Sequence, residues 1–295
     1  MIDKILNAKT LADVLDINDV DAQFRHVVKL VHPDICSDPR ASDAFAKLQL
    51  LKTNFINGES FNDDAGPYKT NGYFIRFSGD KDVQKKSVEW YYRLMKIRTD
   101  ATIFHKYLPA SVSSVNDPAK STPNLDATEY TLLRRGIPLS KLPVPMAQEH
   151  VNWILSRMLE FNVFLHTNNI VHGGYNLNSV FITPEDHGIQ IVSFYHATLA
   201  GHKMQSVSGH YRMWYPAELF VSKKATYDID LELAKRIAAY LLGDRSGIGT
   251  ALKKTHNREF INFLLTRHDD PVEAFKQYRE LLTKNFKKKF HVLNI

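Results

Sequence analysis

The chain has 295 residues and a formal net charge of +6, with 44% hydrophobic and 24% charged residues. This length exceeds what one hydrophobic core usually serves, and the composition excludes disordered and fibrous proteins, so we expect a small module and a larger one. The single cysteine, Cys36, excludes an intramolecular disulfide and a four-cysteine zinc site, and it indicates a reducing compartment, the cytoplasm. The first nine residues lack an apolar signal core, and no later run is long enough to span a membrane.

The positive charge is concentrated near the carboxyl terminus. Residues 1–55 carry a net charge of −1, whereas residues 271–295 carry +4 and include the run Lys287-Lys288-Lys289. No base-reading motif or aromatic-interleaved groove accompanies this run, which favours a solvated helix end over a nucleic-acid site. We therefore expect neither a membrane nor nucleic acid as a partner.

The first predicted element that bears on function is an amphipathic helix over residues 20–31. Its apolar residues recur at spacings of three and four, which place them on one buried face: Val20, Phe24, Val27, Val28 and Val31. The solvent face offers Arg25, His26 and Lys29, which these spacings bring near one another. The helix must end at His32, because Pro33 moves its predecessor out of the helical region and provides no backbone donor.

A second helix is predicted after a short loop. Asp38 reads as its N-cap residue, Pro39 as its first-turn proline, and Asn57-Gly58 as its end. Its course is marked by Phe45, Leu48, Leu51, Lys52 and Phe55. The two helices form an antiparallel hairpin.

The basic-faced helix, the tripeptide His32-Pro33-Asp34 in the loop and the helix that follows resemble the J-domain family over roughly residues 1–57. The resemblance implies that Asp34 offers a carboxylate to a basic surface of a DnaK-class heat-shock ATPase, while His32 and Pro33 fix the loop. It also implies that Arg25, His26 and Lys29 meet acidic groups of that ATPase. One departure is that the aromatic residue usual near the first helix of the family is missing, and the region holds Leu11, Val14, Leu15 and Ile17.

Residues 60–295 are predicted to form the larger module. An alternation of apolar residues over residues 73–77 predicts a strand. Gly79-Asp80 then precedes a predicted helix with one apolar face. A strong helical stripe over residues 151–164 leads into Ile170-Val171-His172-Gly173-Gly174. A hairpin is predicted over residues 180–194, around the turn Asp186-His187-Gly188.

This order resembles the carboxyl-terminal lobe of protein kinases. His172 stands where the catalytic loop begins, Ser193-Phe194-Tyr195 at the Asp-Phe-Gly position, and Pro216-Ala217-Glu218 at the Ala-Pro-Glu position. The resemblance implies an α+β chain: a helical J domain over residues 1–57, then a two-lobed kinase-like domain over residues 58–295. The small lobe covers about 58–135 and the large lobe about 136–295. The whole chain also looks similar to a bacterial and phage arrangement in which a J domain is fused to a divergent kinase-like domain.

The departures from the kinase pattern decide the expected activity. Gly174 stands at the catalytic aspartate position, Ser179 at the asparagine position and Ser193 at the metal-binding aspartate position. Phosphoryl transfer needs a carboxylate to orient the acceptor hydroxyl and Asp and Asn ligands for Mg²⁺, so we expect a pseudokinase. Arg76 stands near the place of the strand lysine, with Glu89 as its expected helix partner.

Other polar residues of this module have structural interpretations. We expect His172 to be a buried, hydrogen-bonded residue that braces its loop, and Glu218 to form an ion pair with Arg267. Glu185 and Asp186 are read as turn residues.

The sequence thus predicts a co-chaperone or adaptor for a DnaK-class chaperone and a protein client that the sequence does not identify. No catalytic residue, metal or cofactor is expected, although ATP binding without turnover is compatible with the pattern. Two alternatives stay open. One is a divergent kinase or nucleotidyl transferase that uses unrecognised acids such as Asp186, Asp228 or Asp230, and the other is a nucleic-acid-binding scaffold based on the basic tail.

Overall fold

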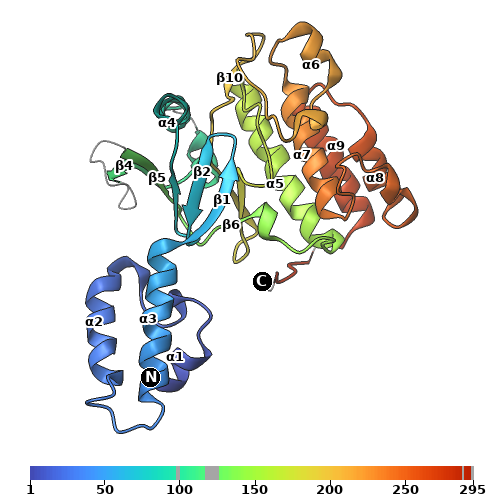
Figure 1. Ribbon diagram of the computed structural model, residues 1–295. Coiled ribbons are helices and arrows are strands. Elements are labelled where there is room, and N and C mark those ends of the chain that lie inside the picture. Colours follow the sequence, from blue (N-terminus) through green and yellow to red (C-terminus); the bar gives the residue numbers. More distant parts are fainter. Residues whose placement is uncertain (98–99, 117–125, 288, 294–295) are drawn as a thin grey trace. The chain divides into compact units, whose positions relative to one another are not determined.

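The computed structural model describes residues 1–97, 100–116, 126–287 and 289–293, so Lys288 of the basic run lies outside the described residues. The chain forms two compact units, each of which is described by itself (Figure 1). The first unit comprises Met1–Ser60 and Lys69–Asn71, and the second comprises Phe61–Tyr68 and Gly72–Ile295. Helices and strands together make the mixed α+β content that the sequence predicts.

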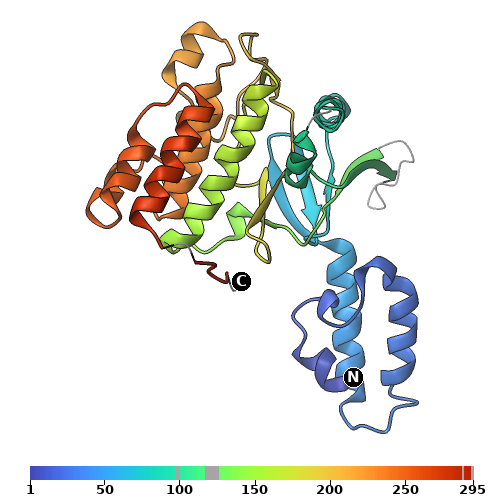
Figure 2. The same ribbon diagram turned by 180° about the vertical axis from the view of Figure 1, so that it is seen from behind.

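The first unit is helical. Its elements are α1 (Ile2–Asn7), η1 (Leu11–Asp13), η2 (Ile17–Asp19), α2 (Val20–Val31) and α3 (Ala41–Asn57). Helices α2 and α3 lie side by side and run in opposite directions (Figure 2). The predicted bounds of α2 are confirmed, because the Asp19 side chain accepts a hydrogen bond from Ala22 and the backbone leaves the helical region at His32.

Helix α3 begins later than predicted, at Ala41 rather than at Asp38-Pro39. The Asp38 carboxylate accepts a 2.9 Å hydrogen bond from the Arg40 backbone and pairs with the Arg40 guanidinium at 3.0 Å. Asp38 therefore closes a turn before the helix instead of capping its first turn. The predicted end is confirmed, since Gly58 follows with a positive φ of 64° and its N–H bonds back to Asn54.

Leucine and valine side chains fill the core of the first unit. Leu11, Val14 and Leu15 are buried in this core. The side chains from α1, α2 and α3 that meet them include Ile5, Phe24, Val27, Val31, Ala44, Leu48 and Leu51. The buried face of α2 is therefore the predicted one, and its basic face stays in solvent.

A five-stranded sheet, most of whose residues belong to the second unit, has the order β1-β2-β3-β5-β4. Its strands are β1 (Glu59–Asp63), β2 (Gly66–Thr70), β3 (Phe74–Phe77), β4 (Ser111–Asn116) and β5 (Asp126–Thr131). Helix α4 (Lys81–Met95) starts at Asp80, whose side chain caps it, and it turns Gln84, Ser87, Tyr91 and Leu94 inward. The Ser87 hydroxyl lies 3.1 Å from the Tyr130 hydroxyl of β5, so α4 packs on this sheet.

The rest of the second unit is mainly helical. Helix α5 (Gln148–Thr167) packs against α7 (Tyr227–Leu241) and α9 (Pro271–Asn285), and Figures 1 and 2 show the three side by side. Between and around them lie η3 (Asp100–Tyr107), β6 (Ile137–Pro138), η4 (Leu139–Lys141), β7 (Ile170–Val171), β8 (Val180–Thr183), β9 (Gly188–Ile191), β10 (Thr198–Leu199), η5 (Arg212–Trp214), α6 (Ala217–Ser222), η6 (Thr250–Lys254) and α8 (Arg258–Leu265). The predicted hairpin is present as β8 paired with β9.

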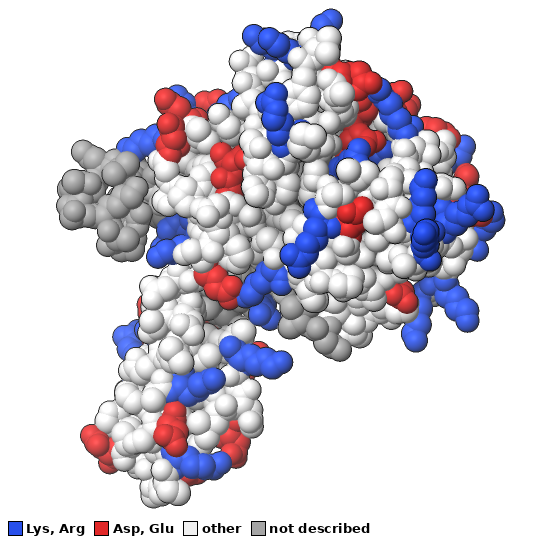
Figure 3. All heavy atoms as spheres, turned by 45° about the vertical axis from the view of Figure 1, so that its right-hand side comes forward, with Lys and Arg blue, Asp and Glu red and all other residues white. Residues whose placement is uncertain are grey.

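The charged side chains of the surface are mixed in sign. On the face that Figure 3 shows, lysines and arginines are scattered among acidic residues. Near the start of the basic run, Lys284 pairs with Glu259 at 2.6 Å. Among the described residues, no helix has the length and apolar character needed to cross a membrane.

Candidate functional site

In the first unit, the loop after α2 presents Asp34 to solvent. The backbone N–H groups of Ile35 and Cys36 both donate to the His32 carbonyl at 2.9 Å, which folds residues 32–36 into a turn. His32 Nδ1 accepts a 3.3 Å hydrogen bond from the Asp34 N–H. The Asp34 side chain is 84% exposed, so its carboxylate can be reached by a partner.

The His32 ring is held from the side of α3. Its centroid lies 5.2 Å from that of Phe45 in an edge-on arrangement, so the loop is tied to the following helix. Arg25, His26 and Lys29 are exposed on α2 as predicted. Arg25 Nε donates to the Asp21 carbonyl at 3.1 Å, within its own helix, and its charge remains at the surface.

In the second unit, the loop after β7 is fixed by a buried carboxylate of α7. The backbone N–H groups of His172 and Gly173 each donate to Asp230 at 2.7 Å, and the Tyr215 hydroxyl donates to the Gly173 carbonyl at 2.8 Å. Burial raises the pKa of Asp230 to about 7, despite the lowering effect of the two backbone hydrogen bonds. The loop is thus braced at its base.

His172 is buried and hydrogen-bonded, as predicted. Its Nδ1 accepts from the Gly174 N–H at 3.2 Å, and its ring stacks on Tyr175 at 4.3 Å between centroids. Burial lowers the pKa of His172 to about 3, so the imidazole is neutral at physiological pH. A neutral ring enclosed in this way supports the loop and has no access to a reacting group.

Gly174 leaves no space for a carboxylate. A Cβ atom at this position would lie 2.4 Å from Cδ2 of His196, which is far closer than carbon atoms approach. His196 itself is nearly fully buried, and its Nδ1 contacts the Ser206 hydroxyl at 2.9 Å. A side chain at this position would therefore collide with the imidazole ring of His196.

Ser179 and Asn176 stiffen the same loop. The Ser179 hydroxyl accepts from the Asn176 N–H at 2.9 Å, and the Asn176 side-chain oxygen accepts from the N–H groups of Asn178 and Ser179 at 2.7 and 2.9 Å. The Asn176 amide nitrogen donates to the Gly174 carbonyl of the same loop at 3.4 Å. Outside the loop it donates to the carboxylates of Asp63 at 2.9 Å and Asp64 at 3.4 Å.

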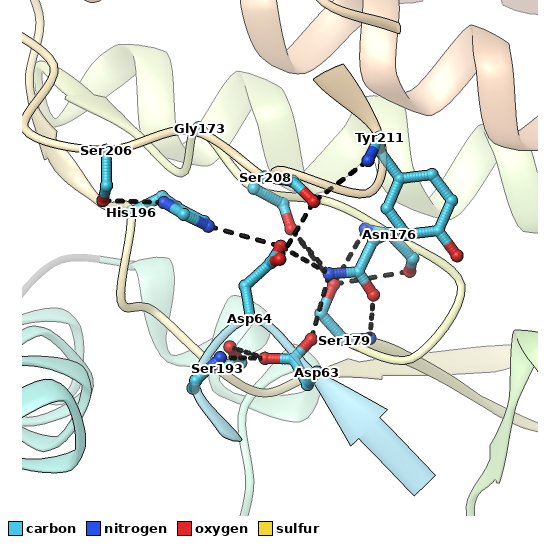
Figure 4. A network of polar contacts seen from close by, with 12 residues as sticks. Asp63, Asp64, Gly173, Asn176, Ser179, Ser193, His196, Ser206, Ser208 and Tyr211 are labelled. Atoms are coloured by element: carbon cyan, nitrogen blue, oxygen red, sulfur yellow. Dashed lines mark hydrogen bonds and ion pairs between the residues drawn. The ribbon is translucent and has the colours of Figure 1, made fainter. Parts of the chain in front are cut away.

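Asp63 and Asp64 are the site residues that the sequence reasoning missed. Asp63 ends β1 and Asp64 begins the turn to β2, and both point into the polar network that Figure 4 shows. The Ser193 hydroxyl donates to Asp63, while the Ser208 hydroxyl donates to Asp64 at 3.0 Å. Two adjacent acids in a strand–turn–strand segment were the available signal, although turns commonly contain aspartate for purely local reasons.

The two carboxylates have opposite pKa shifts. Burial raises the pKa of Asp63 above its ordinary value, against the lowering effect of hydrogen bonds from Ser193, Ala65 and Asn176. Burial also acts to raise the pKa of Asp64, but contacts with His196 and Ser208 outweigh it and hold the pKa below its ordinary value. Asp64 Oδ2 lies 3.3 Å from Nε2 of His196.

Ser193 has the left-handed φ of 67° that a non-glycine residue adopts only under constraint. The next residue, Phe194, is buried, and its N–H donates to the Ser87 hydroxyl of α4 at 2.8 Å. Hydrogen bonds through Asn176 and Asp63 thus connect the three residues that the sequence analysis assigned to degenerate kinase positions: Gly174, Ser179 and Ser193.

The expected pairing of Arg76 with Glu89 is wrong. Arg76 donates to Glu129 at 2.6 and 2.9 Å, because the two residues face each other in the register of β3 and β5. Glu89 lies on the exposed side of α4, whereas the opposite side of that helix packs on the sheet. Cross-strand proximity therefore determines the partner of this arginine.

The predicted ion pair between Glu218 and Arg267 is confirmed at 2.6 Å. Arg267 also pairs with Asp228 at 3.1 Å, so one guanidinium joins α6, α7 and the segment after α8. Asp186 is a turn residue as expected, since it accepts from the Thr183 hydroxyl at 2.6 Å and pairs with Arg134 at 2.7 Å.

Within the described residues, no group of His, Cys, Asp and Glu side chains is arranged to hold a metal ion. The comparisons with known proteins add no family. No protein-family model matches the chain, and a search of curated proteins finds no relative. The functional conclusion therefore depends on the geometry of the two units.

Proposed function

We propose that the chain is a co-chaperone adaptor whose first unit stimulates a DnaK-class ATPase and whose kinase-like second unit binds a client or partner protein without transferring phosphate. The observation that carries this proposal is the exposed Asp34 carboxylate in a turn fixed by His32, beside a helix with an exposed basic face. A flexible acid in a disordered loop would lose more conformational entropy on binding than one held in such a turn.

The architecture of the second unit supports a kinase-like interpretation. A helix placed between the third and fourth strands of an antiparallel five-stranded sheet precedes a largely helical region. In that region, a buried acid of the central helix binds the loop after β7, and Glu218 pairs with Arg267. These features fit the kinase-like motif positions assigned from the sequence.

The proposed absence of transfer rests on three positions that carry no acid. Gly174 has no room for one, Ser179 bonds to its own loop, and Ser193 bonds to Asp63. Phosphoryl transfer depends on charge neutralisation by Mg²⁺ held on Asp and Asn oxygens. Ser193 and Ser179 supply neutral hydroxyls in place of those ligands.

The rival interpretation as a divergent transferase loses its three candidate acids to structural contacts. Asp186 closes a turn, Asp228 pairs with Arg267, and Asp230 binds two backbone N–H groups. The scaffold interpretation gains little from a surface of mixed charge (Figure 3). The single cysteine, Cys36, is partly buried and suits a reducing compartment, so we assign the proposed adaptor to the cytoplasm.

Radiolabelled ATP separates the adaptor from the transferase. Purified full-length chain is incubated with Mg²⁺, labelled ATP and generic protein acceptors, beside an Asn176→Ala variant as the control for contaminating kinases. We expect no label transfer above background. Mg²⁺-dependent label transfer that the Asn176→Ala variant loses would overturn the proposed function of the second unit.

A further inference from the structure

A short segment after α9, residues 289–293, lies against the β8–β9 hairpin, and we call it the strap (Figures 1 and 2). Its Phe290 ring stacks on His187 of the hairpin turn, with 3.9 Å between the ring centroids and 11° between the planes. His187 Nε2 donates to the His291 carbonyl at 2.7 Å. A ring stack and a hydrogen bond therefore hold the strap on the hairpin.

The same imidazole is held by α5. Trp153 stacks on His187 with 4.7 Å between the centroids and 2° between the planes, so the imidazole lies between an indole and a phenyl ring. Trp153 is itself placed by His150, one turn earlier in α5, whose Nδ1 accepts a 3.4 Å hydrogen bond from the indole N–H. Contacts thus run from His150 through Trp153 and His187 to the strap.

These contacts require a neutral His150. A protonated Nδ1 cannot accept the Trp153 N–H, so protonation would set two donors against each other. The His291 ring of the strap lies edge-on to His150 at 6.5 Å between centroids, and Arg157 of α5 donates to the His187 carbonyl at 3.1 Å. A proton on His150 therefore adds charge where cationic and protonatable groups already gather.

The electrostatic environment of His150 has the same direction. Burial lowers the pKa of His150, His187 and His291 lower it further, and Glu149 raises it without outweighing them. Burial also lowers the pKa of His187, against the raising effects of Asp186 and of the hydrogen bond to His291. Because the two stacked rings also favour a charged His187, His150 is the residue whose protonation opposes docking of the strap.

We propose that the strap is a pH-sensitive latch, in which a neutral His150 holds Trp153 in the stack and a protonated His150 releases the strap from the hairpin. Docking is strongest above about pH 6.5, the ordinary pKa of histidine, and it weakens as the pH falls below this value, because the released state binds the proton more readily. The latch lies within the second unit, and its test involves neither ATP nor a chaperone, so it can fail independently of the proposed function.

Trypsin measures how often the strap is free, because cleavage between Lys289 and Phe290 requires the segment to leave the hairpin. The cleavage rate of the full-length chain is divided by that of a free peptide of residues 284–295 at the same pH, which cancels the pH dependence of trypsin. We expect this ratio to rise about tenfold from pH 7.5 to pH 5.5, the factor that one histidine with an ordinary pKa supplies. Circular dichroism verifies that the chain stays folded at both pH values.

Three variants separate the latch from a general effect of acid. His150→Gln keeps an oxygen that accepts from Trp153 but does not titrate, so its ratio should stay low and change less than about twofold. His202→Asn removes an exposed histidine elsewhere in the second unit and should keep the rise of the wild type. Phe290→Ala removes one ring of the stack from an exposed position, so its ratio to a peptide with the same change should be high at both pH values.

The proposal is overturned if the wild-type ratio does not rise as the pH falls. It is also overturned if His150→Gln rises as much as the wild type or is already open at pH 7.5, or if His202→Asn loses the rise. Slow cleavage of Phe290→Ala at pH 7.5, equal to that of the wild type, would show that the ring stack does not hold the strap.

Discussion

Asp230 provides a prediction whose magnitude can be worked out from the structure. Its carboxylate accepts two backbone hydrogen bonds from the loop after β7, and burial raises its pKa from 3.8 to about 7. Asparagine at this position keeps the shape but offers only one oxygen and turns an amide toward a backbone N–H. We expect Asp230→Asn to lower the free energy of unfolding of the second unit by about 2 to 4 kcal/mol.

The loss of unfolding free energy should be larger at low pH than at high pH. A carboxyl whose pKa is raised by folding contributes proton-linked stability that is full below about pH 4 and is lost as the pH rises through 7. At 1.36 kcal/mol per pKa unit, the contribution falls by roughly 2.5 kcal/mol between pH 5 and pH 8. The asparagine variant does not titrate at this position. The difference in unfolding free energy between the wild type and Asp230→Asn should therefore shrink by roughly 2.5 kcal/mol from pH 5 to pH 8.

Urea unfolding followed by tryptophan fluorescence measures the effect, because all three tryptophans, Trp90, Trp153 and Trp214, lie in the second unit. Tyr215→Phe is the matched control. It removes another hydrogen bond to the same loop, but burial raises the pKa of the Tyr215 hydroxyl, so it does not titrate between pH 5 and pH 8. A deficit of Asp230→Asn that is constant over this range, or larger at pH 8, would refute the reasoning.

Three further substitutions test the packing of the site and the ion-pair cluster. Gly174→Asp should destabilise the second unit by at least about 3 kcal/mol, because its Cβ would meet the His196 ring, and in urea unfolding an unchanged midpoint would contradict this. Arg267→Met should cost about 1 to 3 kcal/mol, since Asp228 is buried and would lose its cation. Glu218→Gln should cost clearly less than Arg267→Met because Glu218 is exposed, and equal losses of unfolding free energy in the two variants would contradict a contribution from the buried Asp228.

The sequence predicts helices and strands well where a local signal is sufficient. The bounds of α2 follow from the spacing of its apolar residues and from Pro33, and the end of α3 follows from Gly58. The start of α3 does not follow from the sequence, because an aspartate such as Asp38 can either cap a helix or close a turn. Only the position of Arg40, whose backbone and side chain both reach the Asp38 carboxylate, shows which of the two occurs.

The contacts of the candidate site could not be predicted from the sequence. The sequence shows that Gly174 and Ser193 carry no acid, but it does not show that Asp63 and Asp64 lie near them. These two acids precede their partners by more than 100 positions and meet them only through the tertiary fold. The misassigned partner of Arg76 has the same cause, because strand register places Glu129 opposite it.

The central claim is tested most directly by the ATPase of a DnaK-class chaperone. Single-turnover hydrolysis of bound ATP is measured with the full-length chain, with Asp34→Asn, and with Asp43→Asn, which removes one exposed acid from the first turn of α3. Circular dichroism verifies that both variants keep their helices. We predict that the wild type and Asp43→Asn accelerate hydrolysis more than about tenfold and that Asp34→Asn does not. No acceleration by the wild type, or equal acceleration by Asp34→Asn, would contradict the account.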